Sequence, residues 1–459
     1  DYFFFFFPLF DKMLKRIQTY IADHNLLTKE GKHLVALSGG ADSVALLLIL
    51  KQLEYNIEAI HCNFHLRGEE SDRDEMFCVD LCKKHGINLH ITHFDTKEYC
   101  RLNHVSIEMG ARTLRYAYFH QLLHDIQAES ICVAHHRNDC AETLLMNIIR
   151  GTGVTGLTAI RPKNGKIIRP LLCISRDEII KYLEDMQQDY VTDSSNLVND
   201  VLRNKIRLDI MPKLAEINPS VTEALANTAE HIQQVMPLIE EGVARCLDEI
   251  YVNTETYKQN SEAEAIYLKK LQQSAAPQYV LYAFLSKYGI PAAMISQISK
   301  NIEAQTGKTW ETKDYVIAID RGKLIIEKQE KDFRECIMPM EGTYLLSNGH
   351  KIAISKENMT ADFQMDKSAN TALLDAETIM FPLVIRRVEQ NDSFIPLGMK
   401  GRKLVSDFLT DRKLSIIQKR KQLCVTDASG KIVWIAGQLI NNTNRITEKT
   451  INIVRLRYT

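Results

Sequence analysis

The sequence predicts an α/β protein in three parts: a doubly wound parallel-sheet N-terminal domain, a helical middle domain and a small α/β C-terminal domain. Short β-rich runs alternate with helical patterns between residues 33 and 170, which is typical of a parallel sheet with helices on both faces. The strand pattern stops near Leu214 and, apart from one predicted hairpin before residue 328, returns after residue 342. A length of 459 residues suits two to four domains. We expect the domains at 13–213, 214–330 and 331–459.

Residues 1–12 are apolar and include a run of Phe, but they lack a basic region and are far shorter than the ~20 residues that span a bilayer. We interpret them as an upstream extension or a scar, and not as a targeting signal or a membrane anchor. An amphipathic helix pattern then begins at Met13. The alternation that follows predicts strands at 33–37, 57–63, 89–94 and 130–134, and helices at 43–53, 72–85, 112–126 and 140–150.

Helical spacing of apolar residues dominates the middle domain, at 221–250, 277–287 and 292–302. This domain ends in a predicted β-hairpin with Gly322 at its turn, formed by 315–319 and 324–326. The charged stretch 328–341 is interpreted as a linker. The C-terminal part is expected to contain a helix at 404–409 and strands at 343–346, 351–354, 383–388, 432–436 and 450–455.

The composition is that of an ordinary globular protein, with 45% hydrophobic and 25% charged residues and 57 Lys+Arg against 58 Asp+Glu. This balance disfavours two descriptions of the chain as a whole: a disordered protein and a simple polycationic nucleic-acid binder. The ten cysteines are scattered and form no CxxC pair, which favours a reduced, cytosolic setting. Cys78 and Cys82 share one helix face, where two small buried residues are favoured over metal ligands.

The most informative motif is a Ser-Gly-Gly-Ala-Asp-Ser loop between the strand at 33–37 and the helix at 43–53. The glycines permit a tight turn whose N–H groups face an anion, and the helix N-terminus adds its positive dipole end. The alternative is a loop that only makes the turn and caps the helix. The presence of an Asp and two Ser beside the Gly pair favours phosphate binding. The predicted ATP-binding residues are Ser38, Gly39, Gly40, Ala41, Asp42 and Ser43.

Two other glycine motifs are weak. Gly151, Gly153 and Gly156 spell GxGxxG but follow a helix instead of a strand, so they do not support a dinucleotide site. Gly307-Lys308-Thr309 ends like a phosphate-binding Walker A loop, yet position 302 is Ile.

A second chemical signal is the pair Asp139 and Glu142. They lie i,i+3 on one helix face after a predicted strand, so their carboxylates project together. Such a pair suits a second Mg²⁺ or an ammonium group. A solvated acidic helix start is the alternative.

The Ser38–Ser43 loop resembles that of the N-type ATP pyrophosphatases, a superfamily with an adenine nucleotide alpha hydrolase-like fold. The run 135–143 is similar to the His-His-x-Asp-Asp-x-x-Glu-Thr motif of tRNA(Ile)-lysidine synthetases. Asn138 and Cys140 depart from it, because the family has Asp and Gln there. Further resemblances lie at 61–68, 108–116, 169–172, 193–196, 203–207, 385–388, 392–399 and 403–408.

The resemblance implies adenylation by ATP of the carbon-2 oxygen of the first anticodon cytidine of tRNA(Ile), with anticodon CAU. Attack by free L-lysine then gives lysidine, AMP and pyrophosphate. It implies that Asp42 holds Mg²⁺ and that Asp139 and Glu142 orient the lysine amine and assist its loss of a proton. It further implies that Arg112 and Arg207 act in the active centre, although surface salt bridges are the alternative.

Positive charge is concentrated at the C-terminal end. Residues 381–459 contain fifteen Lys or Arg and six Asp or Glu, a net charge of +9 that leaves −10 for residues 1–380. We interpret this basic part as a tRNA-binding domain whose affinity falls with salt, with a merely solvated surface as the alternative. The predicted tRNA-binding residues are Arg386, Arg387, Lys400, Arg402, Lys403 and Arg420.

Two rival functions remain open. A tRNA 2-thiolation enzyme of the same superfamily would use cysteines, of which Cys62, Cys132 and Cys140 fall near the predicted site. A non-catalytic nucleotide- or RNA-binding protein would be indicated by loss of Asp42 or Glu142, and both are present. We expect a cytoplasmic enzyme without a membrane partner, and the family resemblance leaves a homodimer open.

Overall fold

The computed structural model describes residues 7–192, 202–252, 263–303, 307–330, 333–360, 363, 365–366 and 368–459. The motif at 193–196 and the first six residues lie outside them. The chain forms two compact units, Asp1–Ile239 and Glu240–Thr459.

The first unit contains a six-stranded sheet in the order β3-β2-β1-β4-β6-β5. All neighbouring strands run parallel except β5, which is antiparallel to β6. The predicted parallel sheet is therefore confirmed, and the four predicted strands match β1 to β4 within a few residues. The strands are β1 Lys32–Ala36, β2 Asn56–Asn63, β3 Leu89–His93, β4 Ser130–Cys132, β5 Lys163–Asn164 and β6 Ile167–Ile168.

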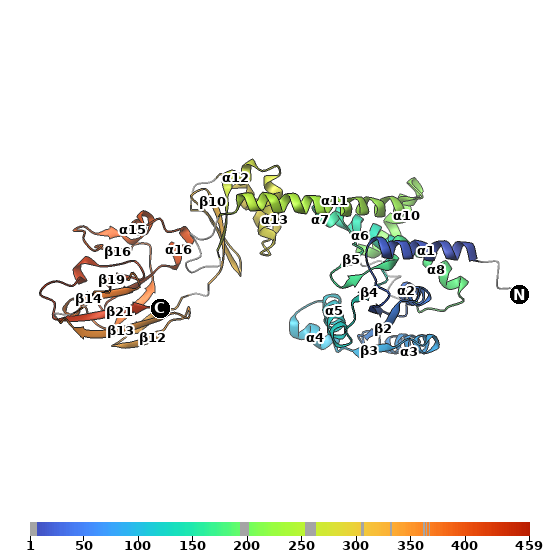
Figure 1. Ribbon diagram of the computed structural model, residues 1–459, viewed down its shortest axis with the longest axis horizontal. Helices are drawn as coiled ribbons and strands as arrows, with labels where there is room; N and C mark the ends of the chain where they lie inside the picture. The colour runs from blue at the N-terminus through green and yellow to red at the C-terminus, as the bar shows by residue number, and fades with distance from the viewer. Residues whose placement is uncertain are drawn as a thin grey trace. The chain divides into compact units, whose positions relative to one another are not determined.

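Helices cover both faces of this sheet because successive residues of β1 point to opposite sides. Val35 packs with α1, α2, α3 and α8, whereas Leu34 packs with α5. Figure 1 shows the ribbon of α5 on one side of these strands and that of α2 on the other. The helix at the N-terminal end begins at Phe7 and not at Met13 as predicted. The helices are α1 Phe7–Asp23, α2 Ala41–Gln52, α3 Glu69–His85, α4 Thr96–Asn103, α5 Ile107–Asp125, α6 Arg137–Ile149, α7 Val154–Leu157, α8 Arg176–Asp185, α9 Leu202–Lys205, α10 Met211–Ile217 and α11 Val221–Ile250, with a 3₁₀ turn at Pro170–Cys173 and a π-helical turn at Ile206–Ile210.

The strand order places a topological switch point between β1 and β4. From β1 the chain builds β2 and β3 outward on one side, then returns to add β4 on the other side of β1. Ligands of open α/β sheets bind at such a point, beyond the carboxyl ends of the strands. The loop after β1 and the start of α6 after β4 are therefore brought together at one edge.

The second unit begins with a helix-rich part that contains more strand than predicted. The hairpin of β9 and β10 is confirmed, and β7 and β8 extend it into a four-stranded antiparallel sheet, β7-β10-β9-β8. Apolar residues of α13 and α14 pack on this sheet. These elements are β7 Glu264–Tyr267, α12 Leu268–Gln273, α13 Pro277–Ser286, α14 Ala292–Lys300, β8 Thr309–Glu311, β9 Tyr315–Asp320 and β10 Lys323–Lys328.

The C-terminal part is β-rich, with a five-stranded and a four-stranded sheet that share one apolar core around Trp434. The predicted strands are present, and β11, β14 and β18 add to them. The elements are β11 Cys336–Met338, β12 Gly342–Leu345, β13 Lys351–Asn358, β14 Thr371–Asp375, β15 Leu383–Arg387, β16 Ser393–Phe394, β17 Lys403–Leu404, α15 Val405–Asp411, α16 Ile416–Lys421, β18 Leu423–Thr426, β19 Ile432–Ile435, β20 Leu439–Ile440 and β21 Asn452–Tyr458, with 3₁₀ turns at Ala376–Thr378 and Asn442–Asn444.

Within the described ranges, no helix has both the length and the apolar character needed to cross a membrane.

Candidate active site

The loop after β1 forms a cradle at the N-terminus of α2. Gly39 has φ +86°, a left-handed conformation that glycine adopts without strain, and Gly40 is the N-cap residue. The Ser43 hydroxyl donates to the Gly40 carbonyl at 2.9 Å, and its oxygen accepts from the Ser38 N–H at 3.2 Å. The buried Ser43 side chain therefore holds the loop, whereas the exposed Ser38 presents its hydroxyl at the surface of the site.

Asp42 is the acidic residue of the first turn of α2. Its Oδ2 lies 3.2 Å from Nη1 of Arg176, and its Oδ1 lies 3.7 Å from Nε2 of His136. That Oδ1 atom is buried and accepts no hydrogen bond from the described residues. Burial raises the pKa of the Asp42 carboxyl above its ordinary value, although His136 and Arg176 oppose the effect.

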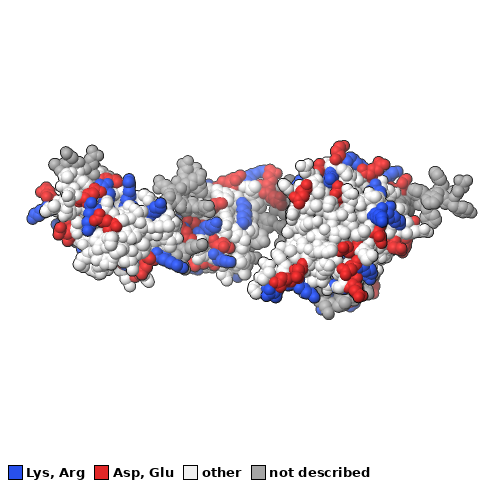
Figure 2. Space-filling model, turned by 90° about the horizontal axis from the view of Figure 1, so that it is seen from below, with Lys and Arg blue, Asp and Glu red and all other residues white. Residues whose placement is uncertain are grey.

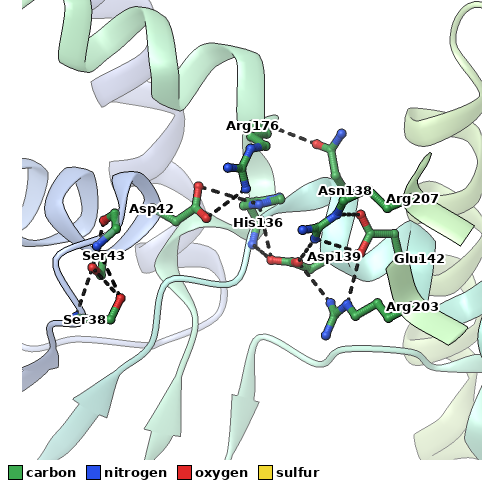
Figure 3. A network of polar contacts seen from close by, with 11 residues as sticks. Ser38, Asp42, Ser43, His136, Asn138, Asp139, Glu142, Arg176, Arg203 and Arg207 are labelled. Carbon is green, nitrogen blue, oxygen red and sulfur yellow. Dashed lines mark hydrogen bonds and ion pairs between the residues drawn. The ribbon is translucent and has the colours of Figure 1, made fainter. Parts of the chain in front are cut away.

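Asp139 and Glu142 form a compact cluster with two arginines from the segment after α8, Arg203 and Arg207 (Figure 3). Arg203 bonds Glu142 through Nε and Asp139 through Nη2, each at 3.0 Å. Arg207 bonds Glu142 at 2.7 and 2.9 Å and Asp139 at 3.2 Å. The backbone N–H of His136 donates to the other Asp139 oxygen at 3.0 Å. The prediction that the two carboxylates project together is confirmed.

This cluster is balanced in charge, because two guanidinium groups face two carboxylates. Burial alone would raise the pKa of Asp139, but His136 and Arg203 hold it below its ordinary value. The pKa of Arg207 is raised by its bonds to Glu142, which outweigh the effect of burial. An incoming ammonium group must therefore compete with arginines that already occupy these carboxylates.

A cavity of about 630 Å³ opens at the carboxyl ends of β1, β2 and β4. Glu142 is buried behind Arg203 and Arg207, which line the wall, and Gly39 shapes the loop. The predicted site residues in the lining are Ser38, Gly40, Ala41, Asp42, Ser43, Arg112, Asp139 and Arg207. The fold thus brings one loop, one helix start and two arginines that are distant in the sequence to the same cavity.

Sequence reasoning did not place Arg176, Arg203 or Arg115 in this cavity, and all three line it. Arg203 carried a usable signal, because it lies i,i+4 from Arg207 and therefore on the same side of a helix. Arg115 has the same relation by i,i+3 to Arg112. Arg176 carried no local signal, since its contact is with Asp42, 134 residues earlier.

His135 and His136 were expected to shape the loop more than to act as acid or base. Burial lowers the pKa of His135 to about 4, with Arg169 and Arg203 adding to the effect, so it is neutral near pH 7. His136 is 1% exposed and packs between Asp42 and Asp139.

The three cysteines near the site are not activated. Cys62 lines the cavity, and burial raises the pKa of its thiol to about 12. Burial likewise raises the pKa of the Cys132 and Cys140 thiols. A thiolate nucleophile is therefore disfavoured at this site.

The predicted tRNA-binding cations lie in the second unit and differ in their contacts. Arg386 forms a two-bond pair with Asp392, at 2.8 and 2.9 Å, and Arg420 bonds Glu311 at 2.6 Å. Arg387 bonds the Arg420 carbonyl and lies 3.7 Å from Glu330, and Lys403 pairs with Asp411. Lys400 and Arg402 are exposed and form no ion pair with the described residues. On the face in Figure 2, blue and red side chains are interspersed over this part of the chain.

The sheet, its switch-point cavity and the Ser38–Ser43 loop at the start of α2 are the features of a PP-loop ATP-binding protein. Residues 10–214 match the model of the family described as a PP-loop domain, and residues 258–331 match that of the TilS substrate binding domain.

Curated relatives narrow the class. The chain is 42% identical to a tRNA(Ile)-lysidine synthase of Bacteroides thetaiotaomicron, with 96% of this chain and 98% of the relative covered. It is 38% identical to that of Parabacteroides distasonis, with 97% and 100% covered. The chain belongs to the tRNA(Ile)-lysidine synthase family. Among solved structures, a U34-tRNA thiolase of Methanococcus maripaludis has a TM-score of 0.41 at 21% identity, over 49% of this chain and 78% of that one.

Proposed function

We propose that this protein converts the first anticodon cytidine of tRNA(Ile), anticodon CAU, to lysidine. ATP adenylates the carbon-2 oxygen of that base and releases pyrophosphate. The ε-amine of free L-lysine then attacks carbon 2, and AMP leaves with the oxygen. The observation that carries the proposal is the joint exposure of the Ser38–Ser43 loop and the Asp139 cluster in one cavity of a chain from this family.

The loop is suited to the triphosphate of ATP. The N-terminus of α2 and the Ser38 hydroxyl offer hydrogen-bond donors to phosphate oxygens, and the helix dipole favours their negative charge. Fixed donors of this kind stabilise the charge that develops on the departing pyrophosphate. Arg112, which lines the same cavity, is proposed to contact phosphate or the adenylated base.

Asp42 is suited to hold Mg²⁺ beside the phosphates. Its buried Oδ1 has no hydrogen-bond donor among the described residues, and one carboxylate together with phosphate oxygens and waters is a common Mg²⁺ environment. Among the described residues, at this site as elsewhere, no group of three His, Cys, Asp or Glu side chains suits a metal ion, so phosphate oxygens and water would complete the coordination of the ion. The ion would supply neutralisation of phosphate charge.

Asp139 and Glu142 are proposed to orient the lysine amine. Free lysine carries an ammonium group with a pKa of about 10.4, which must lose a proton before attack. The pKa of Asp139 is lowered, so its carboxylate stays ionised. It is therefore better suited to orient the lysine ammonium than to keep the proton that the ammonium loses. Binding of the ammonium requires that Arg203 or Arg207 yields part of its contacts, and the released guanidinium then faces the cavity and the phosphates.

The second unit is proposed to bind tRNA through its exposed cations, and among the six predicted residues Lys400 and Arg402 are the two that form no ion pair with the described residues. The described free cysteines fit a cytoplasmic enzyme.

The test is incubation of the pure protein with ATP, Mg²⁺, labelled L-lysine and tRNA(Ile). We expect tRNA-dependent pyrophosphate release and label in the tRNA. ATP consumption with lysine left free would contradict the assignment. Full activity of Asp42→Asn would contradict the proposed metal role.

A further inference from the structure

Arg176 is a cation of the cavity that neither the loop motif nor the α6 motif includes. It is the first residue of α8, and its guanidinium lies beside the phosphate-binding loop, 3.2 Å from Asp42. Its side chain is 40% exposed and lines the same cavity as Ser38 and Gly40. Arg203 and Arg207 each bond two carboxylates, whereas among the described residues Arg176 is ion-paired with the single carboxylate of Asp42.

The backbone of Arg176 is anchored from two directions. Its N–H donates to Oδ1 of Asn138 at 3.1 Å, which ties the start of α8 to the start of α6 (Figure 3). Ser175 and Glu178 form a capping box around it, at 2.8 and 3.3 Å. The guanidinium therefore extends from a fixed point toward the loop.

This contact gives the Asn138 side chain a role at the start of α6. The bond to Arg176 needs only an oxygen acceptor, which an amide provides as well as a carboxylate. The Asn138 amide oxygen therefore anchors the start of α8, from which the Arg176 side chain extends.

The other cations of the wall have different surroundings. Arg112 and Arg115 lie on α5 against aromatic rings, with guanidinium carbons 4.9 Å from the Tyr116 ring centre and 5.1 Å from that of Phe64. Arg176 alone among the described arginines is ion-paired with a residue of the Ser38–Ser43 loop. A guanidinium offers a planar pair of donors that matches phosphate oxygens.

We propose that Arg176 binds the β- and γ-phosphates of ATP, which leave as pyrophosphate, and that Asn138 is the residue that positions it. The identity of the ligand rests on the proposed function. When the Asp42 carboxylate binds a cation that accompanies ATP, the Arg176 guanidinium leaves that carboxylate and binds phosphate oxygens.

The experiment measures binding of pyrophosphate, of α,β-methylene ATP and of AMP to the full chain by calorimetry, with Mg²⁺ and without tRNA. Arg176→Ala is expected to weaken the binding of pyrophosphate and of the ATP analogue about tenfold to a hundredfold. This change in Kd corresponds to the loss of one or two charge-assisted hydrogen bonds. AMP is expected to bind within about twofold of the parent protein, because it lacks the two phosphates in question. Arg176→Lys is expected to recover part of the loss.

Asn138 variants separate positioning from bulk structure. Asn138→Asp keeps the acceptor and is expected to match the parent, whereas Asn138→Ala is expected to raise the KM for ATP about threefold or more with a smaller change in kcat. Arg101→Ala is the control, because Arg101 is an exposed arginine paired with Glu98 outside the cavity. If Arg176→Ala unfolds, Arg176→Lys and the Asn138 pair carry the test.

Unchanged pyrophosphate binding in Arg176→Ala, or an equal loss for AMP, would overturn the proposal. Lack of lysidine formation by the parent protein, together with Arg176-dependent pyrophosphate binding, would refute the proposed function and leave the role of Arg176 standing.

Discussion

Removal of the Glu142 carboxylate tests whether the cluster of two carboxylates and two arginines is a structural unit of the site. Glu142 is 2% exposed and accepts three hydrogen bonds, one from Arg203 and two from Arg207. Removing one partner of a buried ion pair costs ~3–5 kcal/mol. The two arginine side chains are 33% and 27% exposed, so water recovers part of that loss. We expect Glu142→Ala to destabilise the first unit by about 2–3 kcal/mol.

The assay uses two probes that report different units. The only two tryptophans, Trp310 and Trp434, lie in the second unit, so their fluorescence follows its unfolding. Far-UV circular dichroism follows both units. At roughly 2–4 °C per kcal/mol for a unit of this size, the first-unit transition should fall by about 4–12 °C, whereas the fluorescence transition stays in place.

A matched pair is present on the surface. Arg101 and Glu98 are also joined by two hydrogen bonds, at 2.8 and 2.6 Å, but both are exposed. Glu98→Ala is therefore expected to leave both transitions unchanged. A double-mutant cycle of Glu142→Ala with Arg207→Ala should show a coupling of at least ~1 kcal/mol. A coupling near zero would refute the argument that the cluster acts as a unit.

Three further predictions concern the loop, the histidine and the RNA-binding surface. Gly39→Ala forces an L-residue to φ +86° with its Cβ 3.5 Å from Cys78 Sγ, and this should cost ~1–2 kcal/mol by thermal unfolding and raise the KM for ATP. The pKa of His135 is about 4 in the folded protein and about 6.5 in the unfolded chain. Because the unfolded chain binds more protons between these pH values, the free energy of unfolding should fall as the pH drops from 6.5 to 4. His135→Asn should flatten that part of the stability profile measured by circular dichroism. The double variant Lys400→Ala, Arg402→Ala should weaken tRNA binding and reduce its salt slope by about 2, whereas Arg420→Ala, whose charge is paired, should change the slope less in the same filter-binding assay.

Local pattern predicted the parts of the fold whose residues interact with near neighbours in the chain. The helix α11 was predicted at 221–250, where the structure has it, because its apolar spacing is continuous. The loop after β1 was likewise visible from two glycines between an apolar strand and an apolar helix. The strands β7 and β8 were not visible because they have only four and three residues. The partner of β7, β10, also lies far along the chain.

The same distinction holds for the site. Asp139 and Glu142 are one helical turn apart, so their joint projection follows from spacing. Their arginine partners come from more than 60 residues away. Sequence spacing identifies which charges share a helix, but it does not reveal which opposite charge they meet.

This limit matters most where net charge is used to infer a binding surface. A sum of +9 over residues 381–459 counts Arg386 and Arg420 in full, although each lies 2.6–2.9 Å from a carboxylate and contributes little field beyond it. In the cavity of the first unit the same pairing has a different consequence. Arg176 and Arg207 are each ion-paired with carboxylates there. Under the roles proposed above, those carboxylates would turn to a cation, the arginines to phosphate, and the site would favour cation-bound ATP over free phosphate.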